Sequence, residues 1–144
     1  MAFEGTADYT LDAKNRLTVP ARYRAELSSG VVLAKGLDAC VGIWTPDGYE
    51  AFKTAALESF HRLSTERRKL GTYFSANSLP TELDAAGRVM VPSFLSEHAS
   101  LDKEVTVIGA GDHLQVWDRA AWTTFNSALT DDVNQIVSRL GHPA

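Results

Sequence analysis

The chain has 144 residues, of which 44% are hydrophobic and 22% charged, a balance that is typical of a folded globular protein and excludes disorder along its whole length. Its formal net charge of −4 excludes a surface coated with positive charge. No apolar run approaches the roughly 20 residues that span a bilayer, and the start MAFEGTADYT lacks a basic segment followed by an apolar one, so we expect a soluble cytoplasmic protein without a membrane partner.

An internal repeat organises the chain. LDAKNRLTVP at 11–20 aligns with LDAAGRVMVP at 83–92, and VLAKGLDACVGIW at 32–44 aligns with VTVIGAGDHLQVW at 105–117. Two copies are too few for a solenoid, so we expect one compact pseudo-twofold domain over 1–144. Its predicted parts are a first repeat at 5–60, a connecting helix at 61–76, a second repeat at 77–129 and a C-terminal tail at 130–144.

Each copy is predicted to begin with two short strands around a tight turn. Apolar residues alternate with polar ones at 9–11 and again at 17–19, which is the period of a half-buried strand. Asn15 stands where a type I turn followed by a left-handed residue favours glycine, and asparagine tolerates that conformation next best. The residues expected to shape the two turns are Asp12, Asp84 and Gly87.

The remaining elements follow in the same order in both copies. The prolines at 20 and 92 suit the first turn of a short helix, and strands are expected near 31–35, 40–44, 104–108 and 113–117. Ser64 is the predicted N-cap of a helix over 63–74, and a last helix is expected at 131–140. A closing helix in each copy carries apolar residues at helical spacing that we assign to the core: Tyr49, Phe52, Ala56, Trp122, Phe125 and Leu129.

Residues for enzyme chemistry are sparse. The four histidines, at 61, 98, 113 and 142, lack the spacing of metal ligands, and Cys40 fits a small buried apolar residue. The GAGD segment at 109–112 leads into a strand rather than a helix, so it is a hairpin turn and not a phosphate-binding loop. We therefore predict no enzyme activity, no cofactor and no metal.

The polar pattern that recurs is D-x-x-x-R, at Asp12/Arg16 and Asp84/Arg88. An aspartate at the start of a turn accepts backbone N–H groups, and each arginine could simply pair with it. Arg16, however, alternates with Leu17, so it points outward when that leucine faces the core. An outward cation at a turn is suited to phosphates or guanine edges. The candidate DNA-binding residues are Arg16, Lys14, Asn15, Arg22, Arg24 and Arg88.

The two copies differ in basic charge. Ala86, Phe94 and Ser96 stand where the first copy has Lys14, Arg22 and Arg24, so the first copy is the predicted binding face and the second the scaffold. A further basic run, Arg67-Arg68-Lys69 with Arg62, spreads around the connecting helix. It is interpreted as a solvated face, with a secondary nucleic-acid or subunit contact as the alternative.

The duplicated D-x-x-[GN]-R-[LV]-x-V-P motif, each copy followed by a strand pair ending in tryptophan, resembles the MraZ family of bacterial transcriptional regulators. The resemblance runs from Phe3 to about Phe125, and Asn15 departs from the glycine usual in the family. It implies an α+β, β-rich fold: AbrB/SpoVT-like swapped-hairpin repeats in a pseudo-twofold double-split β-barrel. It also implies a DNA-binding role for Arg16 with Lys14 as its basic neighbour, while Arg88 matches the second motif.

The resemblance further implies ring-shaped homo-oligomers in the cytoplasm, associated with the nucleoid. Their partner is double-stranded DNA, at short direct repeats in the promoter of the division and cell-wall gene cluster, which the family mainly represses. Tandem repeats would turn the weak contact of one turn into avid binding.

Two alternatives stay open. One is an oligomeric protein-interaction module in which both turns are architectural, favoured by the acidic net charge. The other is an antitoxin-like swapped-hairpin regulator, disfavoured because such chains carry one motif and a neutralising tail.

Overall fold

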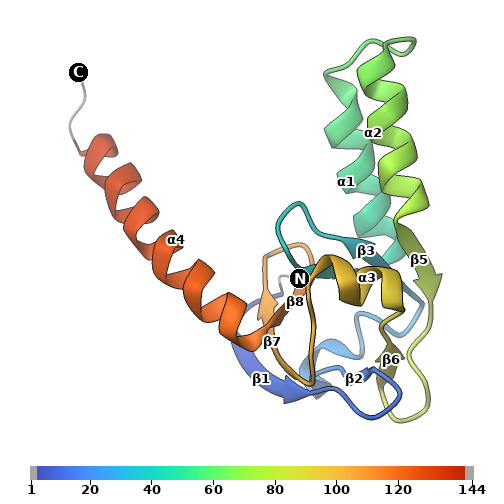
Figure 1. Cartoon of the computed structure of the whole chain (residues 1–144). Coiled ribbons are helices and arrows are strands. Elements are labelled where there is room, and N and C mark those ends of the chain that lie inside the picture. Colours follow the sequence, from blue (N-terminus) through green and yellow to red (C-terminus); the bar gives the residue numbers. More distant parts are fainter. Residues whose placement is uncertain (1–2, 142–144) are drawn as a thin grey trace.

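The computed structural model describes residues 3–141, which form eight strands, four α-helices and one short 3-10 helix (Figure 1). The strands are β1 (Thr6–Thr10), β2 (Arg16–Thr18), β3 (Val31–Lys35), β4 (Val41–Trp44), β5 (Ser78–Thr81), β6 (Arg88–Met90), β7 (Glu104–Gly109) and β8 (Leu114–Asp118). The helices are η1 (Ala21–Tyr23), α1 (Pro46–Glu58), α2 (Thr65–Ala76), α3 (Ser93–His98) and α4 (Arg119–Leu140). The predicted strands and the connecting helix are present, whereas the two helices predicted at the end of the chain are joined in α4.

The strands form an antiparallel six-stranded sheet of order β1-β7-β8-β4-β3-β5 and a separate two-stranded ladder of β2 with β6. The two strands around each turn therefore lie in different sheets, and each pairs with a strand of the other repeat. The predicted β-rich α+β class is confirmed. Within residues 3–141 the sheet is open, with β1 and β5 at its edges, and does not close into a barrel.

Strand register follows the internal repeat. Gly42 of β4 pairs with Gln115 of β8, and Leu17 of β2 pairs with Val89 of β6. Each of these pairs joins equivalent positions of the two copies, so both ladders are centred on one pseudo-twofold axis. The two repeats are interleaved around that axis, and neither copy can complete its sheet without the other.

The main core lies between the six-stranded sheet, the β2–β6 ladder and the short helices η1 and α3. Leu17, Leu33, Ile43, Leu95 and Leu114 are fully buried in it. Each such side chain contributes about 1.5–3 kcal/mol by leaving water. The sheet's other face carries two smaller aromatic clusters, one around Trp44 under α1 and α2 and one around Trp117 under the start of α4.

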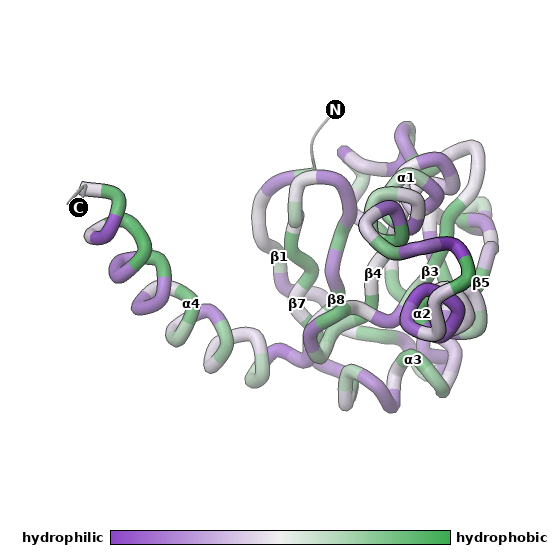
Figure 2. Tube along the Cα trace, turned by 90° about the horizontal axis from the view of Figure 1, so that it is seen from above, coloured by the Kyte–Doolittle hydropathy of each residue, from purple (hydrophilic) through white to green (hydrophobic). Residues whose placement is uncertain are grey.

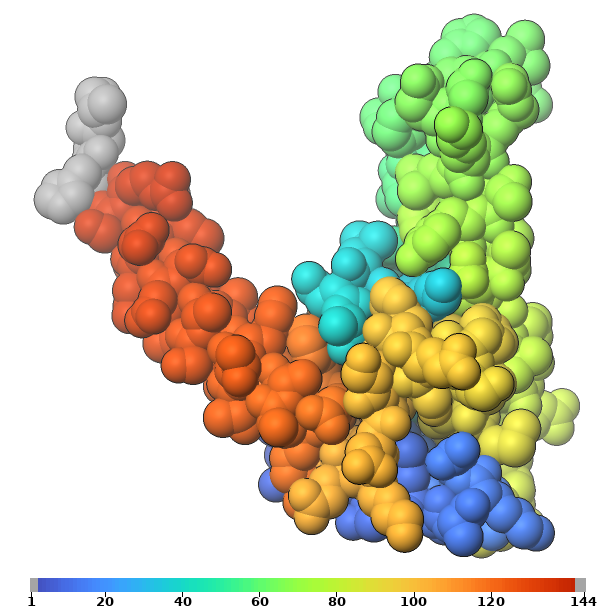
Figure 3. Space-filling model, in the orientation of Figure 1, coloured from blue at the N-terminus to red at the C-terminus, as the bar shows by residue number. Residues whose placement is uncertain are grey.

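Helices α1 and α2 form a projecting hairpin, called here the arm. Thr45 caps α1 by accepting from the N–H of Gly48, and Pro46 occupies its first turn. Ser64 caps α2 by accepting from the N–H of Arg67, which confirms the predicted N-cap. The arm and α4 leave the same side of the sheet and diverge, while the β2 and β6 turns lie at the opposite end (Figures 1 and 3).

Helix α4 is one continuous helix where the sequence predicts a closing helix and a separate tail helix. Asp118 caps it, and Trp122 and Phe125 pack on Trp117. Every residue from 126 to 141 is exposed, so the prediction that Leu129 lies in the core is wrong. The reason is that α2 packs beside α1 and covers Ala56 in the first repeat, whereas α4 has no such neighbour in the described part of the chain.

Apolar residues continue along α4 beyond the body (Figure 2). They recur at helical spacing and remain exposed, as Leu129, Val133, Ile136 and Leu140. None of the helices in residues 3–141 has the length and apolar character needed to cross a bilayer.

Candidate nucleic-acid interface

The first turn is held by the Asp12 carboxylate. Its Oδ1 accepts from the backbone N–H groups of Lys14 and Arg16, each at 2.9 Å, and its Oδ2 accepts from Nε of the Arg16 side chain at 2.7 Å. Asn15 takes the left-handed conformation with φ of 56°, and its N–H donates to the Asp12 carbonyl at 2.9 Å. The motif therefore builds the turn and fixes the arginine in one network.

The second turn repeats this geometry at Asp84. The carboxylate accepts from the N–H groups of Ala86 and Arg88 at 2.9 Å each, and from Nε of Arg88 at 2.9 Å. Gly87 holds the left-handed position with φ of 75°. The spacing D-x-x-x-R is thus the spacing that lets one carboxylate contact the turn backbone and the following arginine together.

The same hydrogen bonds favour the charged carboxylates. The backbone N–H of Arg16 lowers the pKa of Asp12 most strongly, and that of Arg88 does the same for Asp84. Both pKa values lie below the ordinary value of 3.8, so both aspartates carry a negative charge at neutral pH. Each arginine is therefore held by an ion pair as well as by the turn.

The β2–β6 ladder brings the two arginines onto one surface. Leu17 and Val89 point into the core, so the alternating positions on both strands point outward. Arg16 lies opposite Met90 and Arg88 opposite Thr18. The two arginines are therefore diagonal neighbours, whose Cα atoms are typically about 7–8 Å apart in such a ladder. This outward surface of Arg16, Thr18, Arg88 and Met90 is called here the ribbon face.

The arginines of the ribbon face are held in place by their aspartates, yet part of each guanidinium group stays available for binding. Their side chains are 30% exposed at Arg16 and 34% at Arg88. Each pairs with its aspartate through Nε, and no atom of residues 3–141 accepts a hydrogen bond from their Nη groups. The Nη edge of each guanidinium is the edge that a phosphate or a guanine base would contact.

The other predicted residues divide between three places. Lys14 and Asn15 are exposed on the first turn, beside Arg16. Arg24 crosses to the second turn, where its side chain lies against Gly87 and its Nε donates to the Val19 carbonyl at 3.0 Å. Arg22 lies at neither turn, because its Nη2 donates to the Glu4 carbonyl at 3.1 Å and its guanidinium covers Tyr23.

The sequence predicts Arg88 as a candidate DNA-binding residue, and it predicts the second copy as the scaffold because the other basic positions of the first copy are missing there. The ladder register places Arg88 on the same face as Arg16, and Arg24 contributes its charge to the second turn from the first copy. The sequence around either strand does not reveal this pairing, because β2 and β6 belong to different repeats and lie far apart in the chain.

Two arginines of the basic run on the connecting helix stabilise the arm. Nη1 of Arg67 donates to the carbonyls of Leu57 and Phe60, at the end of α1, with 3.1 Å for each. Nη1 of Arg68 donates to the Leu63 carbonyl at 2.7 Å. Both arginines tie the α1–α2 connection together at the end of the molecule away from the ribbon face (Figure 1).

The described residues contain no cluster of three metal-ligating side chains. His98 hydrogen-bonds the carbonyls of Gly36 and Asp38 through Nε2, and His142 lies outside the described residues. Cys40 is buried, and desolvation raises the pKa of its thiol to about 12. That thiol is therefore almost entirely protonated at neutral pH.

Comparison with known proteins gives a consistent assignment. The profile of a family described as "MraZ protein, putative antitoxin-like" matches residues 2–70 and 75–140. The chain belongs to the MraZ family. A protein named "Transcriptional regulator MraZ" from Mycoplasmoides gallisepticum is 34% identical over 138 residues, covering 96% of both chains. One of the same name from Dictyoglomus thermophilum is 34% identical over 140 residues, covering 96% of this chain and 95% of its own.

The family match extends the resemblance drawn from motifs. The motifs end near Phe125, whereas the matched profile continues to residue 140 and so includes the whole of α4. The gap between its two matched segments, at residues 71–74, lies within α2, the helix that connects the two repeats. The family match therefore covers the projecting part of α4 as well.

Proposed function

We propose that this protein is a sequence-specific DNA-binding transcriptional regulator whose ribbon face contacts DNA. The observation that carries the proposal is the pair of arginines on that face, each fixed through Nε and open at Nη. Membership of a family whose relatives are named transcriptional regulators supports it. No catalytic step is part of this role.

A two-stranded β-ribbon has the width of the DNA major groove. Arg16 and Arg88 would then contact guanine edges through Nη, while the exposed Lys14 and Asn15 on the first turn contact the phosphate backbone. Ion pairing with the aspartates holds the guanidinium groups in place before DNA arrives. Binding therefore costs less side-chain entropy than it would for free arginines.

The targets implied by the family resemblance are short direct repeats in the protein's own promoter, upstream of the division and cell-wall genes. Repression follows if the bound protein blocks that promoter. A regulator of this kind acts in the cytoplasm, at the nucleoid.

Tandem DNA sites require several ribbon faces, and α4 offers a route to assembly. Its exposed apolar residues form a narrow stripe that no described residue covers. The arm also exposes apolar side chains, at Phe60, Leu63 and Tyr73. We infer that α4 of one copy packs on the arm of the next, because contact between two different surfaces builds a head-to-tail assembly, which forms a ring when the rotation between copies closes.

A ring would let a protein with an acidic net charge bind DNA tightly. A single ribbon face holds few cations and binds weakly, but copies linked in a ring bind a run of repeats with high effective concentration. Because the arm and α4 project away from the ribbon face, assembly through them leaves that face accessible (Figure 3).

Fluorescence anisotropy with DNA from just upstream of the protein's own gene tests the proposal, with scrambled DNA as the reference. Arg16→Ala and Arg88→Ala should each weaken selective binding, since one bidentate contact is worth about 1–3 kcal/mol, or roughly 5- to 150-fold. Lys69→Ala removes a cation from the arm and is the matched control. Equal, negligible binding of the wild type to both DNAs would instead favour a protein-interaction module.

Light scattering tests the assembly separately. Ile136→Asp places a charge in the apolar stripe and should reduce the mass of the particle, whereas Ser127→Asp on the opposite side of α4 should not. An unchanged mass for Ile136→Asp would contradict the assembly through α4.

A further inference from the structure

Two equivalent tryptophans differ in how their indole N–H is satisfied. In β8, Nε1 of Trp117 donates to Oε1 of Gln115 at 2.9 Å. In β4 the equivalent residue is Trp44, and its neighbour two positions earlier is Gly42 rather than a glutamine. Within the described part of the chain, no group accepts from Nε1 of Trp44.

This unpaired donor opens into a cavity. Trp44 is 5% exposed, yet every side-chain nitrogen and oxygen sealed from solvent in residues 3–141 has a hydrogen-bond partner. Nε1 of Trp44 must therefore reach accessible space. Gly42 keeps that route open, because a Cβ at this position would lie 2.6 Å from the indole nitrogen. A glycine inside a strand is often found where a ligand approaches the backbone closely.

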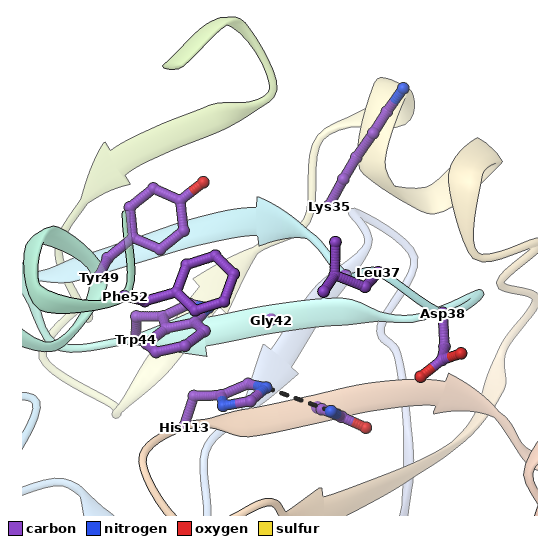
Figure 4. Close-up of a pocket in the computed structure, with 10 residues that line it drawn as sticks. Lys35, Leu37, Asp38, Gly42, Trp44, Tyr49, Phe52 and His113 are labelled. Atoms are coloured by element: carbon purple, nitrogen blue, oxygen red, sulfur yellow. Dashed lines mark hydrogen bonds between the residues drawn. The ribbon is translucent and has the colours of Figure 1, made fainter. Parts of the chain in front are cut away.

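The cavity has a volume of about 140 Å³ and lies between the β3–β4 loop, α1 and β8 (Figure 4). Trp44, Tyr49 and Phe52 form an aromatic wall, and Leu37, which is 75% exposed, lies in the β3–β4 loop that borders it. A cavity of about 150 Å³ holds a benzene molecule. The space therefore suits a molecule with one flat ring.

The donor is held in a fixed direction. The His113 ring stacks on Trp44 with centroids 4.0 Å apart and planes 2° apart. His113 is itself fixed, because Nδ1 is 2.7 Å from Oδ1 of Asp112 and Nε2 is 3.1 Å from Nε2 of Gln115. On the α1 side, Phe52 packs against Trp44 with centroids 5.0 Å apart. These contacts on the indole favour its present orientation, with Nε1 toward the cavity.

We propose that this cavity binds a small planar molecule carrying an amide-type carbonyl, whose oxygen accepts from Nε1 of Trp44. The choice of an amide-type carbonyl comes from the equivalent position in the second repeat, where the side-chain amide carbonyl of Gln115 accepts from Nε1 of Trp117. An indole nitrogen only donates, so the ligand must supply an acceptor. The flat body of the ligand packs between the aromatic wall and Leu37. This site is distinct from the ribbon face, because none of its lining residues belongs to that face.

Benzamide is the probe, titrated against the full-length assembled protein by saturation-transfer NMR. Toluene has a similar ring without the acceptor and serves as the reference ligand. One net hydrogen bond is worth about 3- to 10-fold in affinity, so Trp44→Phe should weaken benzamide binding by about that factor more than it weakens toluene binding. Trp117→Phe, at the twin position, is the matched control and should retain benzamide binding.

A second variant tests the same contact from the strand. Gly42→Gln places a side chain against the indole nitrogen and fills the cavity, so benzamide binding should be lost. The proposal is overturned if wild-type protein shows no saturable benzamide binding, or if Trp44→Phe changes benzamide binding no more than toluene binding. A thermal melt of each variant confirms that it is folded before the titration is interpreted.

Discussion

Replacing Gly87 by alanine should disturb the second turn in two separable ways. Gly87 has φ of 75°, a left-handed conformation that costs an L-residue about 1–2 kcal/mol. A Cβ at this position would also overlap the side chain of Arg24. Moving that side chain breaks its hydrogen bond to the Val19 carbonyl, a further loss of about 1 kcal/mol. We expect a total cost of about 2–3 kcal/mol.

Gly111→Ala is the matched control for this substitution. Gly111 also has a positive φ, of 94°, but a Cβ there would meet no atom within 4 Å. It should therefore cost only the backbone part, about 1–2 kcal/mol. Urea unfolding followed by circular dichroism measures both variants, and Gly87→Ala should be less stable than Gly111→Ala by about 1 kcal/mol.

A double variant tests the role of Arg24 directly. If Gly87→Ala acts partly through Arg24, then adding Arg24→Ala should cost little more, because the contact is already lost. The two substitutions should therefore be non-additive. Equal stabilities for Gly87→Ala and Gly111→Ala, together with simple additivity in the double variant, would refute the role of Arg24 as a support of the second turn.

Three further predictions concern the core, the turns and the thiol. Leu17→Ala removes a fully buried side chain at the centre of the β2–β6 ladder and should lower the free energy of unfolding by about 2–5 kcal/mol in urea. Because folding lowers the pKa of Asp12 and Asp84 below 3.8, their contribution to stability is complete above that pH and is lost as the pH falls through their folded values. The double variant Asp12→Asn/Asp84→Asn should therefore lose less stability than wild type between pH 5 and pH 3, and an identical pH profile would contradict this. Iodoacetamide at pH 8 should modify Cys40 far more slowly in the folded than in the urea-unfolded protein, given its pKa of about 12, and equal rates would show that the thiol is accessible.

Much of the local structure could be predicted from the sequence because its causes lie within a few residues. Ser64 caps α2 from three residues away, and Asp12 contacts Lys14 and Arg16 within its own turn. The left-handed conformation of Asn15 follows from residue type and turn position alone. Alternation of apolar residues likewise located the strands, since it records which side of each strand is buried.

The sequence by itself also determined the duplication, and with it the family and the equivalence of Arg16 and Arg88. Only the tertiary structure decided which strands pair, and so placed those two arginines on one face. It alone brought Arg24 to Gly87 and left Nε1 of Trp44 facing a cavity. The physical reason is distance along the chain: contacts inside a turn are encoded by neighbours, whereas contacts across the pseudo-twofold axis join residues about 70 positions apart and arise only once both repeats have packed.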